Sequence, residues 1–272
     1  MKFLSRFYIA LIFLILYAPI LVVILFSFNR SGSLSQFSGF SFYWYRELFR
    51  DGEALKALKN SLILAVLSSL LATVLGTLCA FAIDRSKRKW FARSVETVTN
   101  IPMMNPDIVT GVSMMLLFVG VAGLLKTASL LGFWTMLIAH TTFNLPYVTL
   151  SVLPKLRQMD NSLSEAALDL GCTPAQTFFR VELPSILPGV LSGLMMSFTL
   201  SLDDFVISHF VSSADFRTLP LYIYNQTAHE VKFSMYALCT LIILVILALL
   251  IAVNFASSVG QRRQRRKVGA RG

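Results

Sequence analysis

Uncharged apolar runs as long as a bilayer is thick constrain this chain more than any other feature. Residues 7–28 contain no Asp, Glu, Lys or Arg. At about 1.5 Å of rise per residue, a helix of this length measures about 33 Å and spans the hydrocarbon core of a membrane. Similar runs, two of which carry isolated Asp residues, follow at 61–83, 103–125, 132–153, 186–210 and 234–256. The sequence therefore predicts an all-α integral membrane protein with six transmembrane helices.

The composition excludes the common alternatives. Of the 272 residues, 56% are hydrophobic and 14% are charged, which is too apolar for a soluble domain or a disordered chain. The first run lacks a small-residue cleavage pattern, so we expect an uncleaved helix rather than a signal peptide. The three widely spaced cysteines predict neither a disulfide framework nor a thiolate metal site.

The distribution of basic residues predicts the orientation, because Lys and Arg accumulate in cytoplasmic loops. If both termini are cytoplasmic, 16 of the 24 Lys and Arg residues lie inside. We therefore expect this orientation. Anionic membrane lipid then accounts for the basic cytoplasmic tail at 257–272 and for the net charge of +10, and no nucleic-acid partner is needed.

The connection at 155–184 is longer than two adjacent helices need. Ser162 and Glu165 form the pattern of a capping box, and an apolar face follows at Leu163, Ala166, Ala167 and Leu170. Gly171 is expected to end this helix. Thr173, Pro174 and Gln176 predict the start of a second short helix, which Pro184 is expected to end. The residues alone leave two interpretations open: a hairpin packed under its own bundle, or a knob that docks on another protein.

This loop resembles the EAA loop of ABC importer permeases, EAA-x3-G-x9-I-x-LP, and the only departure is Val181 in place of Ile. In that family the loop docks into a cleft of the cytoplasmic ATPase. The resemblance therefore implies a type I (MetI-like) ABC importer permease, with a transmembrane core at 57–256 and a cytoplasmic coupling loop at 155–184. The implied coupling residues are Glu165, Ala166, Ala167, Gly171, Leu183 and Pro184.

A second set of segments is similar to the C-type permease subunit of spermidine/putrescine importers. These are 27–29 with Trp44 and Tyr45, 105–109, and 197–204. The resemblance implies a bacterial inner-membrane subunit that carries polyamines. It also implies the partners: a second, homologous permease subunit forming a heterodimer, two copies of an ABC ATPase, and a periplasmic polyamine-binding protein.

Carboxylates at membrane depth are costly and usually face a bundle interior, a partner or a water-filled path. Asp204 shares one helical face with Ser197, Ser201 and Ser208, whereas Asp203 is rotated by about 100° from it and ranks below Asp204 as a pathway residue. We expect Asp204, Asp203, Asp107, Ser201 and Ser197 to line a cation pathway. The alternative for the Asp203–Asp204 pair is a helix end near the outer surface, where the carboxylates reach water or cap a neighbouring helix. The alternative for Asp107 is N-terminal capping after Pro106.

External aromatic residues, Trp44, Tyr45, Tyr222 and Tyr224, could contact a polycation through their ring faces. An interfacial aromatic belt is the favoured interpretation.

Catalytic signatures are absent from the sequence. No Gly-Lys pair exists to form a P-loop, so ATP and Mg²⁺ are expected on the partner ATPase, and the chain itself is not expected to be an enzyme. His140, His209 and His229 lie in different elements, so neither a metal site nor a Ser/His/Asp constellation is predicted. A lone His in a membrane helix, such as His140, is expected to be a hydrogen-bonding packing residue. Two rival functions remain: an ABC permease for another solute, such as ferric iron or a phosphonate, and a stand-alone proton-coupled transporter.

Overall fold

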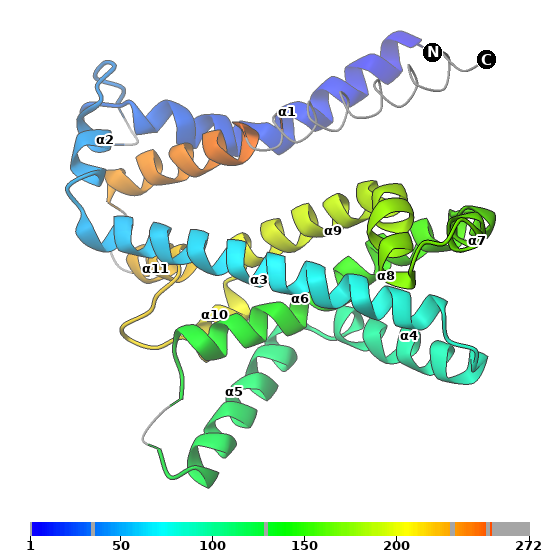
Figure 1. Ribbon diagram of the computed structural model, residues 1–272. Helices are drawn as coiled ribbons and strands as arrows, with labels where there is room; N and C mark the ends of the chain where they lie inside the picture. Colours follow the sequence, from blue (N-terminus) through cyan, green and yellow to red (C-terminus); the bar gives the residue numbers. More distant parts are fainter. Residues whose placement is uncertain (1, 34–35, 128–129, 229–231, 249–250, 252–272) are drawn as a thin grey trace. The chain divides into compact units, whose positions relative to one another are not determined.

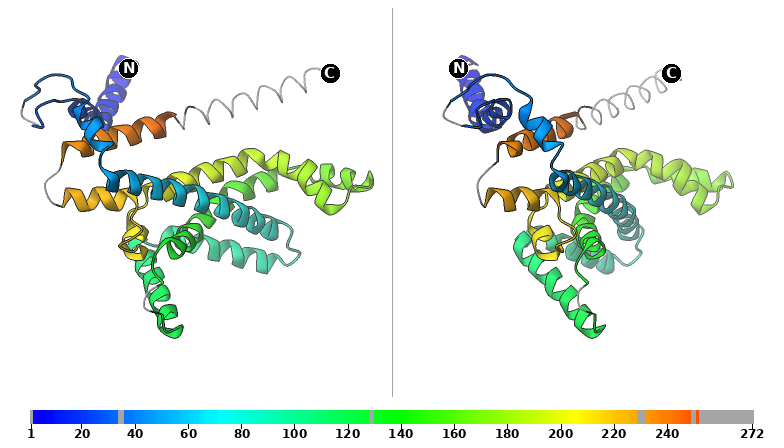
Figure 2. Two further views of the ribbon diagram at one scale, coloured as in Figure 1. Left: turned by 60° about the vertical axis from the view of Figure 1, so that its left-hand side comes forward. Right: turned by 90° about the vertical axis from the view of Figure 1, so that its left-hand side faces the viewer.

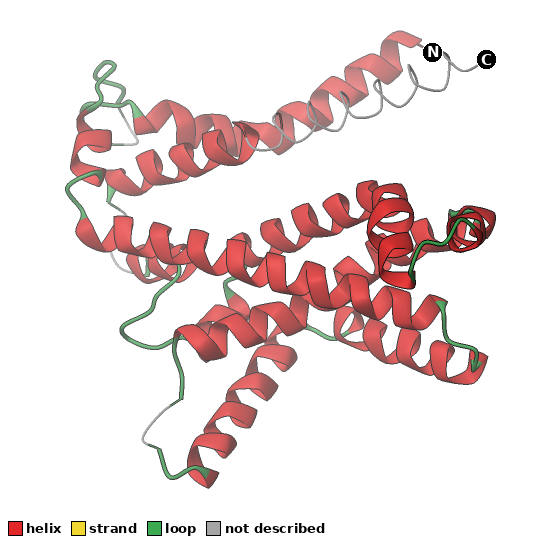
Figure 3. Ribbon diagram, in the orientation of Figure 1, coloured by secondary structure: helices red, strands yellow, loops and turns green. Residues whose placement is uncertain are grey.

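The computed structural model describes residues 2–33, 36–127, 130–228, 232–248 and 251. Within these ranges the secondary structure consists of helices and one isolated β-bridge, between Asn29 and Phe40 (Figures 1 and 3). The elements are α1 (Lys2–Ser27), α2 (Tyr43–Leu48), α3 (Gly52–Asp84), α4 (Lys89–Met104), α5 (Asp107–Leu124), α6 (Phe133–Gln158), α7 (Asn161–Asp169), α8 (Pro174–Thr177), the π-helix η1 (Phe178–Glu182), α9 (Leu183–Asp203), α10 (Val206–Val211) and α11 (Leu219–Thr227).

Five described helices are long and apolar enough to cross a membrane, and each overlaps one of the first five predicted spans. They cover Arg6–Ser27, Gly52–Asp84, Asp107–Leu124, Phe133–Gln158 and Pro174–Asp203. A shorter apolar helix, Phe233–Ala248, begins where the sixth span is predicted. The rest of that span and the basic tail at 257–272 lie outside the described residues, apart from Ile251, so six spans with cytoplasmic termini stay a prediction.

The chain divides into two compact units, one formed by residues 1–55 and 223–272 and the other by Lys56–Tyr222. In the first unit, the apolar window of α1 has no buried residue, which suits a helix surrounded by lipid. The loop after α1 is organised by Asn29. Its side-chain amide donates to the backbone carbonyls of Ser33 and Gln36. Its backbone carbonyl oxygen accepts a hydrogen bond from the Trp44 indole at 2.7 Å.

In the second unit, α6 packs tightly between α3 and α9. A Cβ added at Gly76 of α3 would lie 2.8 Å from the Cβ of Val148, and one added at Gly193 of α9 would lie 3.1 Å from the Cα of Val148. Small residues allow helices to approach this closely where no hydrophobic effect drives association in lipid. Lys155 of α6 lies beside Gly189 of α9, Val148 beside Gly193, and His140 beside Ser201, so these two helices are antiparallel.

Two of the predicted spans are interrupted. Asn105 and Pro106 separate α4 from α5, so the apolar run 103–125 becomes the end of one helix and the whole of another. The run 186–210 is divided in the same way, because Asp204 adopts an extended conformation and α10 starts again at Val206. The helices that follow the two interruptions, α5 and α10, pack against each other at Gly111. A Cβ added at Gly111 would lie 2.9 Å from the Phe210 ring.

We predict opposite effects for two Gly→Ala substitutions in these helices. A Cβ at Gly189 of α9 would lie 2.8 Å from the backbone oxygen of Ser151, which cannot move freely. Gly189→Ala should therefore destabilise the detergent-purified permease by about 1–3 kcal/mol, as overpacking does. Gly120→Ala on α5, where nothing lies within 4 Å, should leave the melting temperature unchanged or slightly raised. Equal melting temperatures for the two variants would contradict the α6–α9 packing.

Candidate functional site

The EAA-type loop (residues 155–184) folds as a short helix followed by a turn and the beginning of a long helix. The N-cap of α7 is Asp160, whose carboxylate accepts from the backbone N–H of Ser162, so Ser162 is not the cap that the sequence pattern predicted. Hydrogen bonds from the backbone N–H and from the side chain of Ser162 hold the pKa of the Asp160 carboxyl below its usual value. The predicted capping box of Thr173 and Gln176, with Pro174 in the first turn, is confirmed at α8.

The second helix of the loop does not end at Pro184. It continues from α8 through the π-turn η1 into α9, and Pro184 follows directly after the π-turn, where the regular hydrogen-bond ladder is already shifted and a residue without an N–H is accommodated. The prediction that Pro184 terminates this helix was wrong for that reason. Leu183 and Pro184 therefore connect the loop rigidly to the fifth apolar helix.

Most of the predicted apolar face of α7 is open. Leu163 and Ala166 are exposed, Leu170 is 86% exposed, and Ala167 is buried. Glu165 is also exposed. A hairpin packed under its own bundle would bury this face, so the placement favours the alternative in which another protein covers it.

Gly171 ends α7 in a left-handed conformation, with φ of +86°, and a Cβ there would meet nothing within 4 Å. The residue is required by backbone conformation rather than by space.

The loop is anchored by Glu182, a residue that sequence reasoning missed. Its carboxylate is 1% exposed, forms an ion pair with Arg85 from the α3–α4 turn, and accepts a hydrogen bond from Ser164 Oγ at 2.9 Å. No local pattern marks Glu182, because its partners are distant in the sequence.

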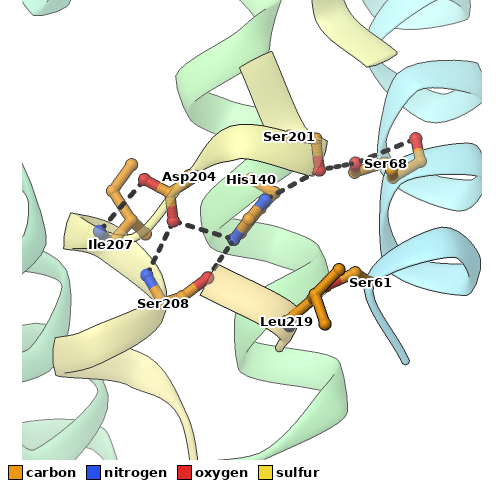
Figure 4. A network of polar contacts seen from close by, with 9 residues as sticks. Ser61, Ser68, His140, Ser201, Asp204, Ile207, Ser208 and Leu219 are labelled. Atoms are coloured by element: carbon orange, nitrogen blue, oxygen red, sulfur yellow. Dashed lines mark hydrogen bonds and ion pairs between the residues drawn. The ribbon is translucent and has the colours of Figure 1, made fainter. Parts of the chain in front are cut away.

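A buried polar network connects four elements in the apolar region (Figure 4). The imidazole of His140 on α6 is at its centre, with Nδ1 2.8 Å from Ser201 Oγ and Nε2 3.2 Å from Ser208 Oγ. Ser201 Oγ is also 2.8 Å from Ser68 Oγ on α3. Asp204 completes the network, with Oδ2 3.4 Å from His140 Nε2. The sequence interpretation of His140 as a hydrogen-bonding packing residue agrees with this placement.

The two adjacent carboxylates have different surroundings. The side chain of Asp204 is 8% exposed, and it accepts backbone N–H groups from Ile207 at 3.1 Å and from Ser208 at 2.8 Å. It therefore caps the start of α10 while contacting His140, which corresponds to the capping alternative. Asp203 is exposed, as is Asp107 at the first position of α5. No side-chain capping hydrogen bond forms at the α5 N-terminus, although the carboxylate of Asp107 lies at the positive end of the helix dipole.

Ser197 lies one turn before Ser201 on α9 and is fully buried, yet its hydroxyl has no hydrogen-bond partner among the described residues. The antiparallel α6–α9 contacts place it at the level of Asn144, whose side-chain amide is also buried without a partner in the described ranges. Buried polar groups are nearly always satisfied in stable proteins. Ser197 and Asn144 therefore retain hydrogen-bonding capacity inside the bundle.

Ser201, His140 and Asp204 form the Ser/His/Asp combination that the sequence did not predict. The arrangement lacks the features of a hydrolase site, because Ser201 and His140 are buried and the Ser201 hydroxyl is also bonded to Ser68. Among the described residues no cluster of three or more His, Cys, Asp or Glu side chains could hold a metal ion. The network is best described as a structural connection between helices.

Two of the four aromatic residues expected outside the membrane, Trp44 and Tyr45, contact the end of α1 and the segment that follows it. The Tyr45 hydroxyl is 2.8 Å from Ser27 Oγ, and the Trp44 indole donates to the Asn29 carbonyl. Tyr222 is buried and Tyr224 is half exposed. The segment 27–29 and its two aromatic partners therefore form one local structure.

Comparison of the sequence with known protein families identifies the family of this chain. Residues 72–268 match the model of the binding-protein-dependent transport system inner membrane component. The chain belongs to this family. The resemblance carried by the EAA-type loop is thereby confirmed.

Named relatives of this permease family cover most of the chain. The putrescine transport system permease protein PotI of Escherichia coli (strain K12) is 38% identical over 85% of this chain and 82% of its own length. The spermidine/putrescine transport system permease protein PotC of Haemophilus influenzae is 38% identical over 92% of this chain and 94% of its own length.

Solved structures support the fold of this permease. A bacterial ABC transporter that imports the acidic polysaccharide alginate contains a chain with a TM-score of 0.76, which covers 96% of this chain and 95% of its own length at 18% identity. A chain of the MetNI methionine ABC transporter gives a TM-score of 0.58 at 20% identity, over 79% of this chain and 95% of its own length. At these identities the likeness concerns the fold alone.

We predict that the turn after α7 tolerates Asn but not Val at position 171. The left-handed conformation costs a residue with a Cβ about 1–2 kcal/mol, or about five- to thirty-fold faster hydrogen exchange where the turn opens locally. Asn adopts this conformation readily. Gly171→Val should therefore accelerate amide exchange in α7, and Gly171→Asn should not. Equal exchange in the two variants would show that the positive φ is unimportant.

We also predict energetic coupling across the buried network. His140→Ala and Ser201→Ala should each destabilise the permease, and the double variant should be less destabilised than the sum by about 0.5–3 kcal/mol, because both substitutions remove the same contact. The control pair is His140→Ala with Thr199→Ala, since Thr199 is exposed on the same helix as Ser201. Thermal unfolding of the three single and two double variants measures both cycles. Additive effects in the first cycle would contradict the network.

Proposed function

We propose that this chain is a permease subunit of an ABC importer that moves polyamines inward across the bacterial inner membrane. The observation that carries the proposal is the identity of 36–38% to permeases named for putrescine and spermidine/putrescine transport, over 82–94% of their lengths. The chain itself is a transport subunit and not an enzyme. ATP and Mg²⁺ would be bound by a partner ATPase.

The proposed assembly contains a second, homologous permease subunit, two copies of the ATPase and a periplasmic polyamine-binding protein. The open face of α7 supports ATPase docking, because Leu163, Ala166 and Leu170 need a covering surface and Glu165 is exposed beside them. Transport would follow alternating access, in which ATP-driven closure of the ATPase moves the EAA-type loop. Both termini would be cytoplasmic, and the basic tail would face anionic lipid.

Charge in the apolar spans supports a cationic substrate. The five predicted spans from 7 to 210 contain Asp107, Asp203 and Asp204 and no Lys or Arg. Asp203 and Asp107 have exposed carboxylates, so they are the stronger candidates for direct contact with a polyamine, while Asp204 and Ser201 would support the pathway from within the network. The unmet hydrogen-bonding capacity of Ser197 supports its assignment to the pathway.

The rival functions predict different experimental results. A ferric iron or phosphonate permease would show no stimulation of ATP hydrolysis by polyamines. A stand-alone proton-coupled transporter would work without an ATPase and stop when the proton gradient is collapsed. The EAA-type loop favours the ATP-driven interpretation over the latter.

The test is uptake of spermidine and putrescine by proteoliposomes that contain the complete complex and its binding protein. Removing one charge about 4 Å from a bound ammonium group in a hydrated path costs about 1 kcal/mol, or about a five-fold rise in KM. We expect this rise for Asp203→Asn. Asp215→Asn, which neutralises an exposed carboxylate between α10 and α11, is the matched control and should leave uptake unchanged. ATP hydrolysis that no polyamine stimulates would refute the proposed substrate.

A further inference from the structure

Glu182 is buried and charged at a point where three elements meet. It lies in η1, its carboxylate forms an ion pair with Arg85, and Ser164 of α7 donates to the same oxygen, Oε1. Its second oxygen, Oε2, is buried and has no hydrogen-bond partner in the described part of the chain. Ser164 immediately precedes Glu165 of the EAA pattern, so the contact reaches the helix that bears that pattern.

Aromatic contacts strengthen the same junction. The Phe81 ring on α3 lies 4.9 Å from the Phe178 ring on η1, and the Arg85 guanidinium lies over the Phe81 ring at 5.7 Å. The π-turn contributes to this arrangement, because its extra residue rotates the preceding residues by about 100° relative to α9. The cytoplasmic end of α3 is thus attached to the loop by an ion pair and an aromatic pair.

The path from this junction into the membrane is rigid. From Arg85, α3 runs back without interruption to Gly52 and carries Gly76, which contacts Val148, and Ser68, which contacts Ser201 in the His140 network. In Figures 1 and 2 the α3–α4 turn and the α7–α8 turn lie at the same end of the second unit. A displacement of α7 therefore moves α3 through the ion pair. It also moves α9, because α9 is continuous with the loop.

Stability alone does not account for this pair. Arg85 is 56% exposed, so it compensates the buried carboxylate incompletely, and well-packed apolar residues often replace a buried ion pair without loss of stability. A directional ionic contact at the joint between the loop and α3 has a further use, because it holds the two elements in one relative position while they move together.

We propose that Glu182 and Arg85 are positioning residues that transmit the movement of the EAA-type loop to α3, so that ATP hydrolysis in the partner opens and closes the pathway. The inference rests on the proposed function, since it assumes that an ATPase acts on this loop. According to this inference, the loop moves two helices, α3 and α9.

The experiment compares solute uptake per ATP hydrolysed in proteoliposomes of the complete complex. The variants are Glu182→Gln, Arg85→Gln, their double variant and the conservative Arg85→Lys. Arg88→Gln is the matched control, because it removes a positive charge from the same turn, and Arg88 forms no ion pair in the described residues. Co-purification of the ATPase is measured for every variant.

We expect Glu182→Gln and Arg85→Gln to lower uptake per ATP by about ten-fold, with the double variant no worse than either single variant, as for two residues that share one interaction. Arg85→Lys should restore part of the coupling, because an ammonium group can still pair with the carboxylate although it lacks the planar guanidinium that lies over the Phe81 ring. Arg88→Gln should match the native protein, and the ATPase should remain bound throughout.

Three results would overturn the inference: native uptake per ATP in both Gln variants, multiplicative effects in the double variant, or an equal loss in Arg88→Gln. Loss of the ATPase that Arg85→Lys does not restore would equally overturn it in favour of a role in folding. An error in the proposed substrate gives a different result from an error in this inference. If the complex imports another solute, uptake per ATP hydrolysed can be measured with that solute in the same variants.

Discussion

The close contact of three helices around Val148 sets the geometry of the second unit. Gly76 of α3 and Gly193 of α9 both leave room for this side chain, and neither position accommodates a Cβ without displacement. In lipid, apolar side chains gain little by leaving one hydrocarbon environment for another, so association depends on close packing and on polar contacts. Glycines at the crossing allow the packing, and the buried serines and His140 supply the polar contacts.

This crossing separates two polar clusters with different chemistry. Two turns before Val148 on α6, His140 connects α6 to Ser201 and Ser208 through hydrogen bonds with two serine hydroxyls. Just beyond the C-terminal end of α3, Arg85 and Glu182 form an ion pair in which the Arg85 side chain is 56% exposed. The difference follows from the cost of charge, since an ion pair is tolerated better at the edge of a membrane than in its hydrocarbon core. Rigid helices between the clusters allow a force at one to reach the other.

Helix interruptions give neighbouring carboxylates different roles. Asp203 ends α9 and is exposed, whereas Asp204 turns back to satisfy two free N–H groups of α10. A broken helix in a membrane must satisfy its backbone groups internally, and an adjacent carboxylate does this well at the positive end of a new helix. Sequence reasoning ranked Asp204 above Asp203 because it assumed one continuous helix, and the break reverses their accessibility.

Local sequence patterns were enough to predict the membrane class, five of the apolar helices, the end of α7 at Gly171, the cap at Thr173 and the permease family. Each of these depends on local features: the length of an apolar run, the conformational freedom of glycine, or a spacing within one segment. The folded structure was needed to find the role of Pro184, the cap at Asp204, the partners of His140, and the burial of Glu182 against Arg85. These depend on contacts between residues that are far apart in the chain, or on whether a helix continues, and no local pattern of residue types specifies either one.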